Sequence, residues 1–339
     1  MTRSAFVSSC GDPFLILFTH KLFKERWYDE VDEFIVCYNN HVQVPQDVIG
    51  EVLSKLSQDP KVHIVYHPRG IGNGMPITEM TLINKADLVL LLEDDGFIFE
   101  KGAVNENFQK IESDLCDAVG SPRFSCGQEI GEASRTKYGL DYSGYGDMGC
   151  NFWPNFFFCK RKDLLKTDLN CASKTFQKGE YCKELDYIFK EINHGDTFVW
   201  ASIQLRAMGL RFHTIPQHKA DPFEIDSKEK KEQNWHSSQQ PFKWIHGGSL
   251  SAGWGGYLSG RIPDVSNDSA KQEMESRVAF WQLASDICDI DLFDDIASDD
   301  MKAFYISYKQ GIEDLIKNVG LNKARIDQKI QIYKKLMNL

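Results

Sequence analysis

Leu88-Val89-Leu90-Leu91-Leu92-Glu93-Asp94-Asp95-Gly96-Phe97-Ile98-Phe99 is the stretch of this sequence that decides its fold. An apolar run ends in three consecutive carboxylates, and a glycine and a second apolar run follow. A run this short and this apolar is typical of a strand that is buried on both faces of a parallel sheet. Because burying carboxylates without partners is costly, we expect them at the carboxyl end of the strand, where open α/β sheets bind ligands.

The carboxylates of Glu93, Asp94 and Asp95 are hard oxygen ligands. Gathered in a ligand crevice, such groups favour Mg²⁺ or Mn²⁺ that carries a phosphorylated substrate. The alternative is a solvated acidic turn that follows a strand. The stretch alone does not decide between a metal site and a turn.

The residues before this stretch alternate between strand and helix patterns. We expect strands over residues 5–10, 33–40, 61–66 and 86–92, and helices over 15–27, 45–56 and 77–85. This rhythm predicts a doubly wound, mostly parallel α/β sheet flanked by helices. The glycine-rich segment 69–76 follows the third strand and does not have the GxGxxG spacing, which excludes a dinucleotide fingerprint.

The pattern after residue 99 is less regular. We expect helices over 105–115, 176–192 and 198–209, strands over 117–123, 151–160 and 210–216, and long irregular segments over 125–149 and 217–262. Helical periodicity returns over 271–287, 299–319 and 322–337. The sequence therefore predicts an α/β domain over residues 1–262 and a C-terminal helical appendage over 263–339.

Composition narrows the class of protein. The chain has 339 residues, 42% of them hydrophobic, and a net charge of −10, which argues against a general nucleic-acid binder. No segment reaches the length of a transmembrane helix. The nine cysteines form no CxxC pair, which fits reduced thiols in the cytoplasm, and Cys10 and Cys37 are interpreted as small core residues.

Three motifs in this order resemble those of the GT-A glycosyltransferases, particularly the inverting family 2 type, over about residues 5–256. They are LLLEDDGFI at 90–98, GDTFVWASIQLRAMGLRFHTIP at 195–216 and KWIHGGSLSAGW at 243–254. The first stands where the family has its DxD-like motif, and the second where it has its catalytic base. The resemblance implies a GT-A fold, a nucleotide-sugar donor, UDP- or GDP-linked, and a divalent cation.

The resemblance also implies roles for single residues. Asp95 would be the metal ligand, with Glu93 and Asp94 toward the donor. A histidine beyond the second motif would complete the metal site: His246 is the first choice, and His236 and His218 are alternatives. Asp196 would be the base that removes the proton of the acceptor hydroxyl. The alternative for Asp196 is an ordinary helix N-cap.

Four polar residues at expected strand ends or loops are candidates for contacts with the donor: Ser8, Asn39, Arg69 and Asn73. The guanidinium fork of Arg69 suits a phosphate. The alternative for each of the other residues is ordinary turn chemistry. Trp153 and Trp254 could stack on a sugar ring or simply pack in the core.

Together the patterns and the resemblance imply a cytoplasmic, Mn²⁺- or Mg²⁺-dependent glycosyltransferase that moves a sugar to the hydroxyl of a glycan or another acceptor. That the reaction is inverting is implied by the resemblance alone. One rival is a sugar-phosphate nucleotidyltransferase, whose N-terminal glycine-rich signature is missing here. The other is a non-catalytic GT-A-like binding or scaffold module. The C-terminal helices could cover the acceptor site, form a homodimer or touch a membrane surface. Their polar faces carry both Lys and Asp or Glu, which favours a folded helical hairpin over a membrane anchor.

Overall fold

The computed structural model describes a large part of the chain. The described residues are 1–41, 44–72, 74–123, 126–139, 151–215, 217–219, 236–238, 243–247, 250, 265, 268–292 and 297–339. Among them, no helix is both long enough and apolar enough to cross a membrane.

A seven-stranded sheet with the order β14-β6-β9-β4-β1-β2-β3 forms the centre of the molecule. Its strands are β1 (Arg3–Ser9), β2 (Glu33–Asn39), β3 (Val62–His67), β4 (Leu88–Glu93), β6 (Ala118–Gly120), β9 (Phe157–Lys160) and β14 (Phe212–Thr214). All neighbouring pairs are parallel except those that β9 makes with β4 and β6. The predicted mostly parallel α/β sheet is confirmed.

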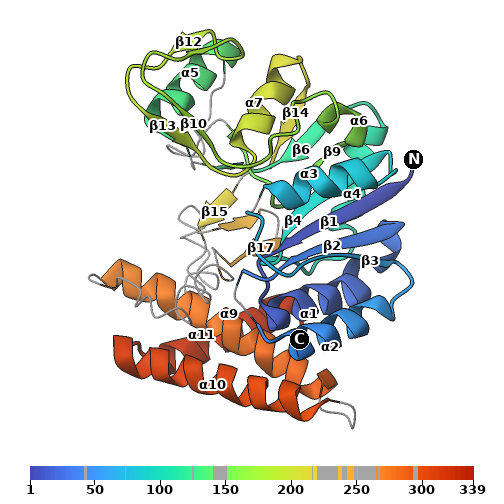
Figure 1. Ribbon diagram of the computed structural model, residues 1–339, viewed down its shortest axis with the longest axis vertical. Coiled ribbons are helices and arrows are strands. Elements are labelled where there is room, and N and C mark those ends of the chain that lie inside the picture. The colour runs from blue at the N-terminus through green and yellow to red at the C-terminus, as the bar shows by residue number, and fades with distance from the viewer. Residues whose placement is uncertain are drawn as a thin grey trace.

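Helices cover both faces of this sheet (Figure 1). On one face lie α1 (Pro13–Leu22), with the turns η1 (Phe23–Trp27) and η2 (Tyr28–Glu30), and then α2 (Gln46–Ser57) and α4 (Ala103–Glu112). On the other lie α3 (Met75–Ile83), α6 (Arg161–Leu164) and α7 (Val199–Ala207). Strand residues alternate between the two cores: Phe34 and Val36 pack on the α1 side, Ile35 and Cys37 on the α3 side.

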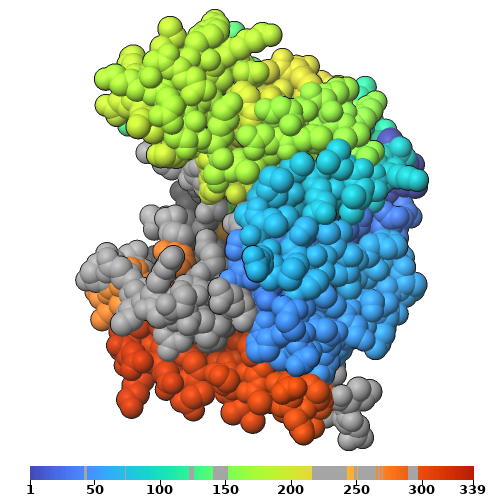
Figure 2. All heavy atoms as spheres, viewed as in Figure 1, coloured from blue at the N-terminus to red at the C-terminus, as the bar shows by residue number. Residues whose placement is uncertain are grey.

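The C-terminal helices α9 (Asp268–Leu292), α10 (Asp299–Val319) and α11 (Lys323–Met337) pack below α1 and α2, as predicted for a helical C-terminal part (Figure 1). They share one core with the sheet, and the Phe280 ring stacks on that of Phe97 at 5.3 Å. Figure 2 shows these helices, in orange and red, beside residues of the N-terminal third. The domain boundary at residue 262 stays a prediction, because residues 251–264 lie outside the described ones.

A second, four-stranded antiparallel sheet has the order β15-β16-β17-β5. It consists of β5 (Gly96–Ile98), β15 (Gln217–Lys219), β16 (His236–Ser238) and β17 (Trp244–His246). Three of these short strands fall in the segment 217–262 that we expected to be irregular. The pairing of β17 with β5 joins residues about 150 positions apart, as Ile245 to Phe97, and local periodicity does not reveal such pairing.

The region between residues 122 and 195 differs most from the expectation. It contains α5 (Gln128–Tyr138), inside a predicted loop, and the strands β7 (Pro122–Arg123), β8 (Asn151–Phe152), β10 (Lys174–Phe176), β11 (Tyr181–Cys182), β12 (Tyr187–Ile188) and β13 (Asn193–Gly195). The helix predicted over 176–192 is wrong: Gly179 and Asp186 have positive φ angles, which end helices. The strand predicted over 151–160 is split at Phe156, where φ is 56°.

Candidate functional site

The acidic residues lie at the carboxyl end of β4, where the sequence places them. Glu93 is the last residue of β4, Asp94 and Asp95 form a turn, and Gly96 begins β5. β4 lies between β1 and β9 in the middle of the sheet, and its five preceding residues are buried. The buried strand therefore fixes the carboxylates at the edge of the sheet where parallel strands present ligand sites.

His246 reaches this edge from a segment about 150 residues further along the chain. It is the last residue of β17, it pairs with Gly96 of β5, and the Gly247 N–H donates to the Asp95 carbonyl at 2.8 Å. Its Nε2 lies 2.9 Å from Asp95 Oδ1 and 3.8 Å from Glu93 Oε2. One ligand atom from each of Glu93, Asp95 and His246 lies within 4.8 Å of the other two. We call these three residues the acidic triad.

Neighbouring groups orient the acidic triad. The Leu250 N–H donates to Asp95 Oδ2 at 3.1 Å, which turns Oδ1 toward His246. The Trp153 ring stands edge-on to the His246 ring, with 3.8 Å between ring centroids. The side chains of Asp95 and His246 are 6% and 1% exposed, whereas Glu93 keeps 19%. The side chains of the acidic triad are thus held in place by their neighbours, and the site is open to solvent on the side of Glu93.

Asp94 points away from the acidic triad. Its Oδ2 accepts hydrogen bonds from Ser9 Oγ and from the Cys10 N–H, both at 2.9 Å. Asp94 is also 2% exposed, so this carboxylate ties the turn after β4 to the end of β1. Its predicted contact with the donor stays a prediction.

The three carboxylates make this edge of the sheet strongly electronegative. The neighbouring Cys10 thiol is affected by these charges. Burial, and then the charges of Asp94, Glu93 and Asp95, raise the pKa of this thiol well above the ordinary value. A group of negative charges in a low-dielectric setting attracts a cation. The electrostatics therefore favour a cation site over a solvated turn.

Asn155 is a neighbour of the site that sequence reasoning missed. It is fully buried between β8 and β9, and its Oδ1 accepts a long hydrogen bond of 3.5 Å from the Glu93 N–H. A Cβ at position 96 would lie 2.1 Å from that oxygen, so only glycine fits there. Among the described residues its Nδ2 has no hydrogen-bond partner. The only sequence signal was a polar residue inside an aromatic run.

Of the four predicted donor contacts, Ser8, Asn39 and Arg69 lie at or just beyond the carboxyl ends of strands of the same sheet. Ser8 is buried and pairs with Glu93 across β1 and β4. Asn39, the last residue of β2, is fully buried, and within the described part of the chain neither of its amide atoms has a hydrogen-bond partner. Arg69 is exposed in the loop after β3. Asn73 lies outside the described residues.

Asp196 lies in the loop between β13 and α7. This loop belongs to the part at the top of Figure 1 that contains α5, β10, β12, β13 and α7, which we call the upper lobe. It is exposed, and its Oδ1 accepts from the Thr197 N–H at 2.7 Å. The interpretation of Asp196 as a helix N-cap is wrong, because α7 starts after Phe198, whose φ of 68° ends the preceding turn. The catalytic role of Asp196 stays a prediction.

The other two histidine candidates belong to the second sheet. His218 lies on β15 and His236 on β16, where His236 pairs with Lys219. Their side chains lie outside what the structure describes. His246 is the histidine that the described residues bring to the carboxylates.

The ligand atoms of the acidic triad, two carboxylates and one imidazole, fit a divalent cation. Carboxylate oxygens suit Mg²⁺ and Mn²⁺, and an imidazole nitrogen shifts the preference from Mg²⁺ toward the transition metals. Two carboxylates also balance the charge of one such ion. The set therefore fits Mn²⁺ better than Mg²⁺.

No protein-family model and no curated protein matches the chain. Solved structures do. TarS of S. aureus is 10% identical with a TM-score of 0.42, covering 100% of this chain and 90% of that one. A mannosyltransferase from Pyrobaculum calidifontis, in complex with GDP-Man and Mn²⁺, is 10% identical with a TM-score of 0.41, covering 99% and 85%.

Glucosyl-3-phosphoglycerate synthase from Mycobacterium tuberculosis, in complex with Mn²⁺, UDP-Glc and phosphoglyceric acid, is 15% identical with a TM-score of 0.33. The match covers 48% of this chain and 57% of that one. These TM-scores are too low to carry residue roles from those proteins to this chain.

Proposed function

We propose that this chain is an Mn²⁺-dependent glycosyltransferase that moves a sugar from a nucleotide-sugar donor to an acceptor hydroxyl with inversion. The observation that carries the proposal is the acidic triad: Glu93, Asp95 and His246 lie within 4.8 Å of one another at the carboxyl edge of the sheet. Asp95 and His246 come from segments about 150 residues apart, and β5–β17 pairing holds them together.

Asp95 and His246 would hold the cation, and Glu93, the most exposed of the three, would face the donor. The cation, when bound, neutralises charge on the diphosphate leaving group. The buried amide of Asn39 would bind the nucleoside, and the Arg69 guanidinium would reach a phosphate. GDP- and UDP-sugars with Mn²⁺ are the ligands in two of the solved structures named above.

Asp196 would take the proton of the attacking hydroxyl. One of its oxygens, Oδ1, accepts the Thr197 N–H, which leaves Oδ2 to receive that proton. A carboxylate base within hydrogen-bond reach contributes about 10²–10⁴ in rate. A retaining reaction would not need this base, so the role of Asp196 depends on inversion.

The proposal is tested in two steps on the full chain. A thermal-shift screen of UDP-, GDP-, CMP- and dTDP-sugars, with and without Mn²⁺, should show one donor that raises the melting temperature only with Mn²⁺. Release of the nucleoside diphosphate in the presence of candidate glycans then measures transfer. No shift with any donor would overturn the proposal in favour of the scaffold alternative.

Asp196→Asn tests the base. We expect donor binding as in the wild type and a rate of transfer lower by about 10²–10⁴. The matched control is Asp186→Asn, an exposed aspartate of the same lobe whose positive φ asparagine also accepts. Full transfer by Asp196→Asn would show that another group removes the proton.

A further inference from the structure

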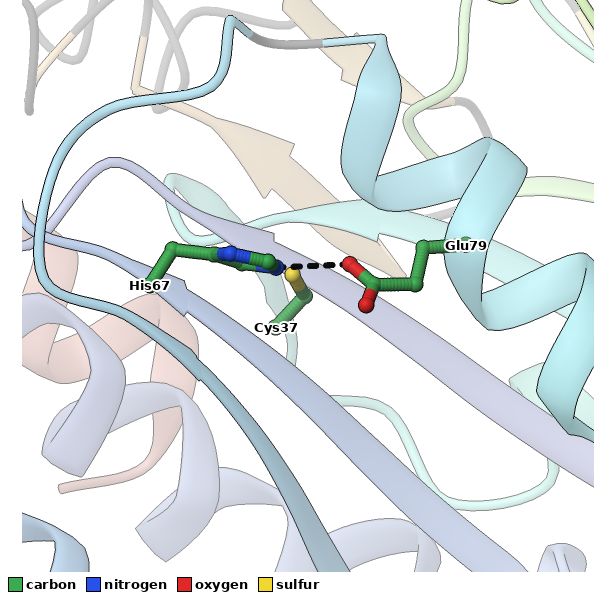
Figure 3. Close-up of side chains that lie close together, drawn as sticks. All are labelled: Cys37, His67 and Glu79. Carbon is green, nitrogen blue, oxygen red and sulfur yellow. Dashed lines mark hydrogen bonds and ion pairs between the residues drawn. The ribbon is translucent and has the colours of Figure 1, made fainter.

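A second group of ligand-type side chains lies two strands away from the acidic triad (Figure 3). It consists of Cys37 on β2, His67 at the end of β3 and Glu79 on α3. One ligand atom of each lies within 4.8 Å of the other two, and His67 Nε2 lies 2.6 Å from Glu79 Oε2. Figure 3 shows the Cys37 sulfur beside the tip of the imidazole. We call this group the thiol triad.

The strand alternation and the covering helix build the thiol triad. Cys37 faces the α3 side of the sheet, and its partner on β3 is Val65, so His67, two residues further on, faces the same side. α3 packs over this face and brings Glu79 against His67. Cys37 is buried, whereas the side chains of His67 and Glu79 are 23% and 36% exposed. An ion can therefore enter from the side of His67 and Glu79.

The thiol triad and the acidic triad are separate centres. Cys37 pairs with Ser8 of β1, and Ser8 pairs with Glu93 of β4. Two strand spacings of about 4.8 Å place the backbones of Cys37 and Glu93 roughly 10 Å apart. Metal ions that act together in one site lie about 4 Å apart. The thiol triad is thus no part of the proposed Mn²⁺ site.

We propose that Cys37 Sγ, His67 Nε2 and the Glu79 carboxylate form a metal site for a zinc-type cation, with a fourth position open toward solvent. Thiolate and imidazole ligands favour Zn²⁺ over Mg²⁺ or Mn²⁺, which the oxygen-rich acidic triad suits better. One thiolate and one carboxylate balance the two charges of the ion. On binding, the Cys37 thiol releases its proton to solvent, and His67 carries its remaining proton on Nδ1.

The observed geometry needs only a small opening to hold the ion. Tetrahedral zinc with bonds of about 2.1 Å separates neighbouring N and O ligands by roughly 3.4 Å. The 2.6 Å distance between His67 Nε2 and Glu79 Oε2 would therefore have to increase. The increase is smaller than the distance that the Glu79 carboxylate moves when its side chain changes rotamer. Glu79 is partly exposed on a helix and can make this shift.

The rival interpretation is an ordinary His–Glu pair above a buried core cysteine. Burial, and then the charge of Glu79, raises the pKa of the Cys37 thiol to about 12, so the thiol is no nucleophile by itself. The two interpretations differ in one observable. The rival predicts that a thiolate-binding cation leaves Cys37 untouched.

The test is a titration of the full chain with Co²⁺, whose thiolate complexes absorb in the near ultraviolet. We expect the thiolate-to-cobalt band to saturate at one equivalent and Zn²⁺ to bleach it. Cys37→Ala should abolish the band. Cys159→Ala, which removes another fully buried cysteine of the same core, should keep it. Absence of the band from the wild type, or an unchanged band in Cys37→Ala, would overturn the proposal.

Two further variants separate this site from folding and from the proposed Mn²⁺ site. Glu79→Gln changes a partly exposed residue, and we expect it to fold as the wild type and to weaken Co²⁺ binding at least about tenfold. Asp95→Asn should leave the thiolate band unchanged. Loss of the band in Asp95→Asn would mean that the thiol triad has no independent site, whereas failure of the donor screen leaves this result unaffected.

Discussion

Neighbouring carboxylates in the turn after β4 have different surroundings, and these predict different effects of substitution. Asp95 and Glu93 face His246, whereas Asp94 accepts hydrogen bonds from Ser9 and Cys10 at the end of β1. From the sequence we predicted carboxylates at the end of a strand, and from the family resemblance we preferred His246 over His218 and His236. The sequence does not show that the Asp94 side chain points toward β1 and away from the acidic triad, because side-chain direction in a tight turn depends on the segment packed against it.

Asp94→Ala tests this difference between Asp94 and its two neighbours. The variant leaves the Ser9 hydroxyl and the Cys10 N–H without their acceptor in a buried setting, which costs about 1–3 kcal/mol of unfolding free energy. Urea unfolding of variant and wild type measures the loss. Unchanged stability would mean that Asp94 does not fasten β1 to the turn.

Trp153 is predicted to position the His246 ring. Trp153→Leu removes the edge-on contact at 3.8 Å and should lower the affinity for Mn²⁺ about tenfold. Trp200→Leu is the matched control, because Trp200 is equally buried, at 5%, but belongs to the core of the upper lobe. Isothermal titration with Mn²⁺ compares the two. Equal Mn²⁺ affinities would assign Trp153 to packing alone.

At the scale of elements, the strands and helices with strong local patterns were predictable and the long-range pairings were not. Apolar runs and helical spacing located β1 to β4 and the helices between them within a few residues. The β5–β17 ladder, which builds the acidic triad, joins two three-residue strands and leaves no periodic signal. Over residues 176–192 the local pattern misled in the other direction: the spacing of apolar residues predicted a helix that the structure does not have. Positive φ angles at the turn residues Gly179 and Asp186 prevent a helix there.

The start of α1 is predicted to make stability depend on pH. Asp12 caps α1, with Oδ1 accepting from the Phe14 N–H, and its Oδ2 accepts from the Tyr308 hydroxyl of α10 at 2.8 Å. Burial raises the pKa of Asp12 from 3.8 to about 6. Because the folded protein holds this proton more tightly, the contribution of Asp12 to stability is present below about pH 4 and is lost as pH rises toward about 6.

Asp12→Asn should remove this dependence, because asparagine caps a helix without titrating. Relative to the wild type, the variant should gain up to about 3 kcal/mol of unfolding free energy between about pH 4 and about pH 7. Urea unfolding at the two pH values measures the difference. The same difference between variant and wild type at both values would show that Asp12 does not titrate in this range.

At the scale of the whole molecule, the C-terminal helices are part of the main core. Phe280 of α9 stacks on Phe97 of β5 and on Tyr333 of α11, with centroid distances of 5.3 and 4.2 Å. Trp281 Nε1–H donates to the carbonyl of Leu250, the residue whose N–H donates to Asp95 Oδ2. Helical periodicity predicted the helices, but which surface they cover depends on tertiary contacts that a single sequence does not display.

Phe280→Ala tests whether this core is shared. We expect a loss of about 3–5 kcal/mol, seen equally by far-ultraviolet circular dichroism and by tryptophan fluorescence in one coincident transition. The reason is that the cavity lies between the helices and the second sheet. Two separate transitions, with helix signal lost first, would instead support an appendage over 263–339 that unfolds by itself.

Binding of Mn²⁺ to the full chain, followed by the electron paramagnetic resonance signal of the free ion, tests the acidic triad most directly. We predict one ion per wild-type chain, with affinity at least about tenfold lower in Asp95→Asn and in His246→Gln. Asp163→Asn, which changes a carboxylate of similar burial on α6, should bind as the wild type. Wild-type affinity in both Asp95→Asn and His246→Gln would contradict a metal site formed by Glu93, Asp95 and His246.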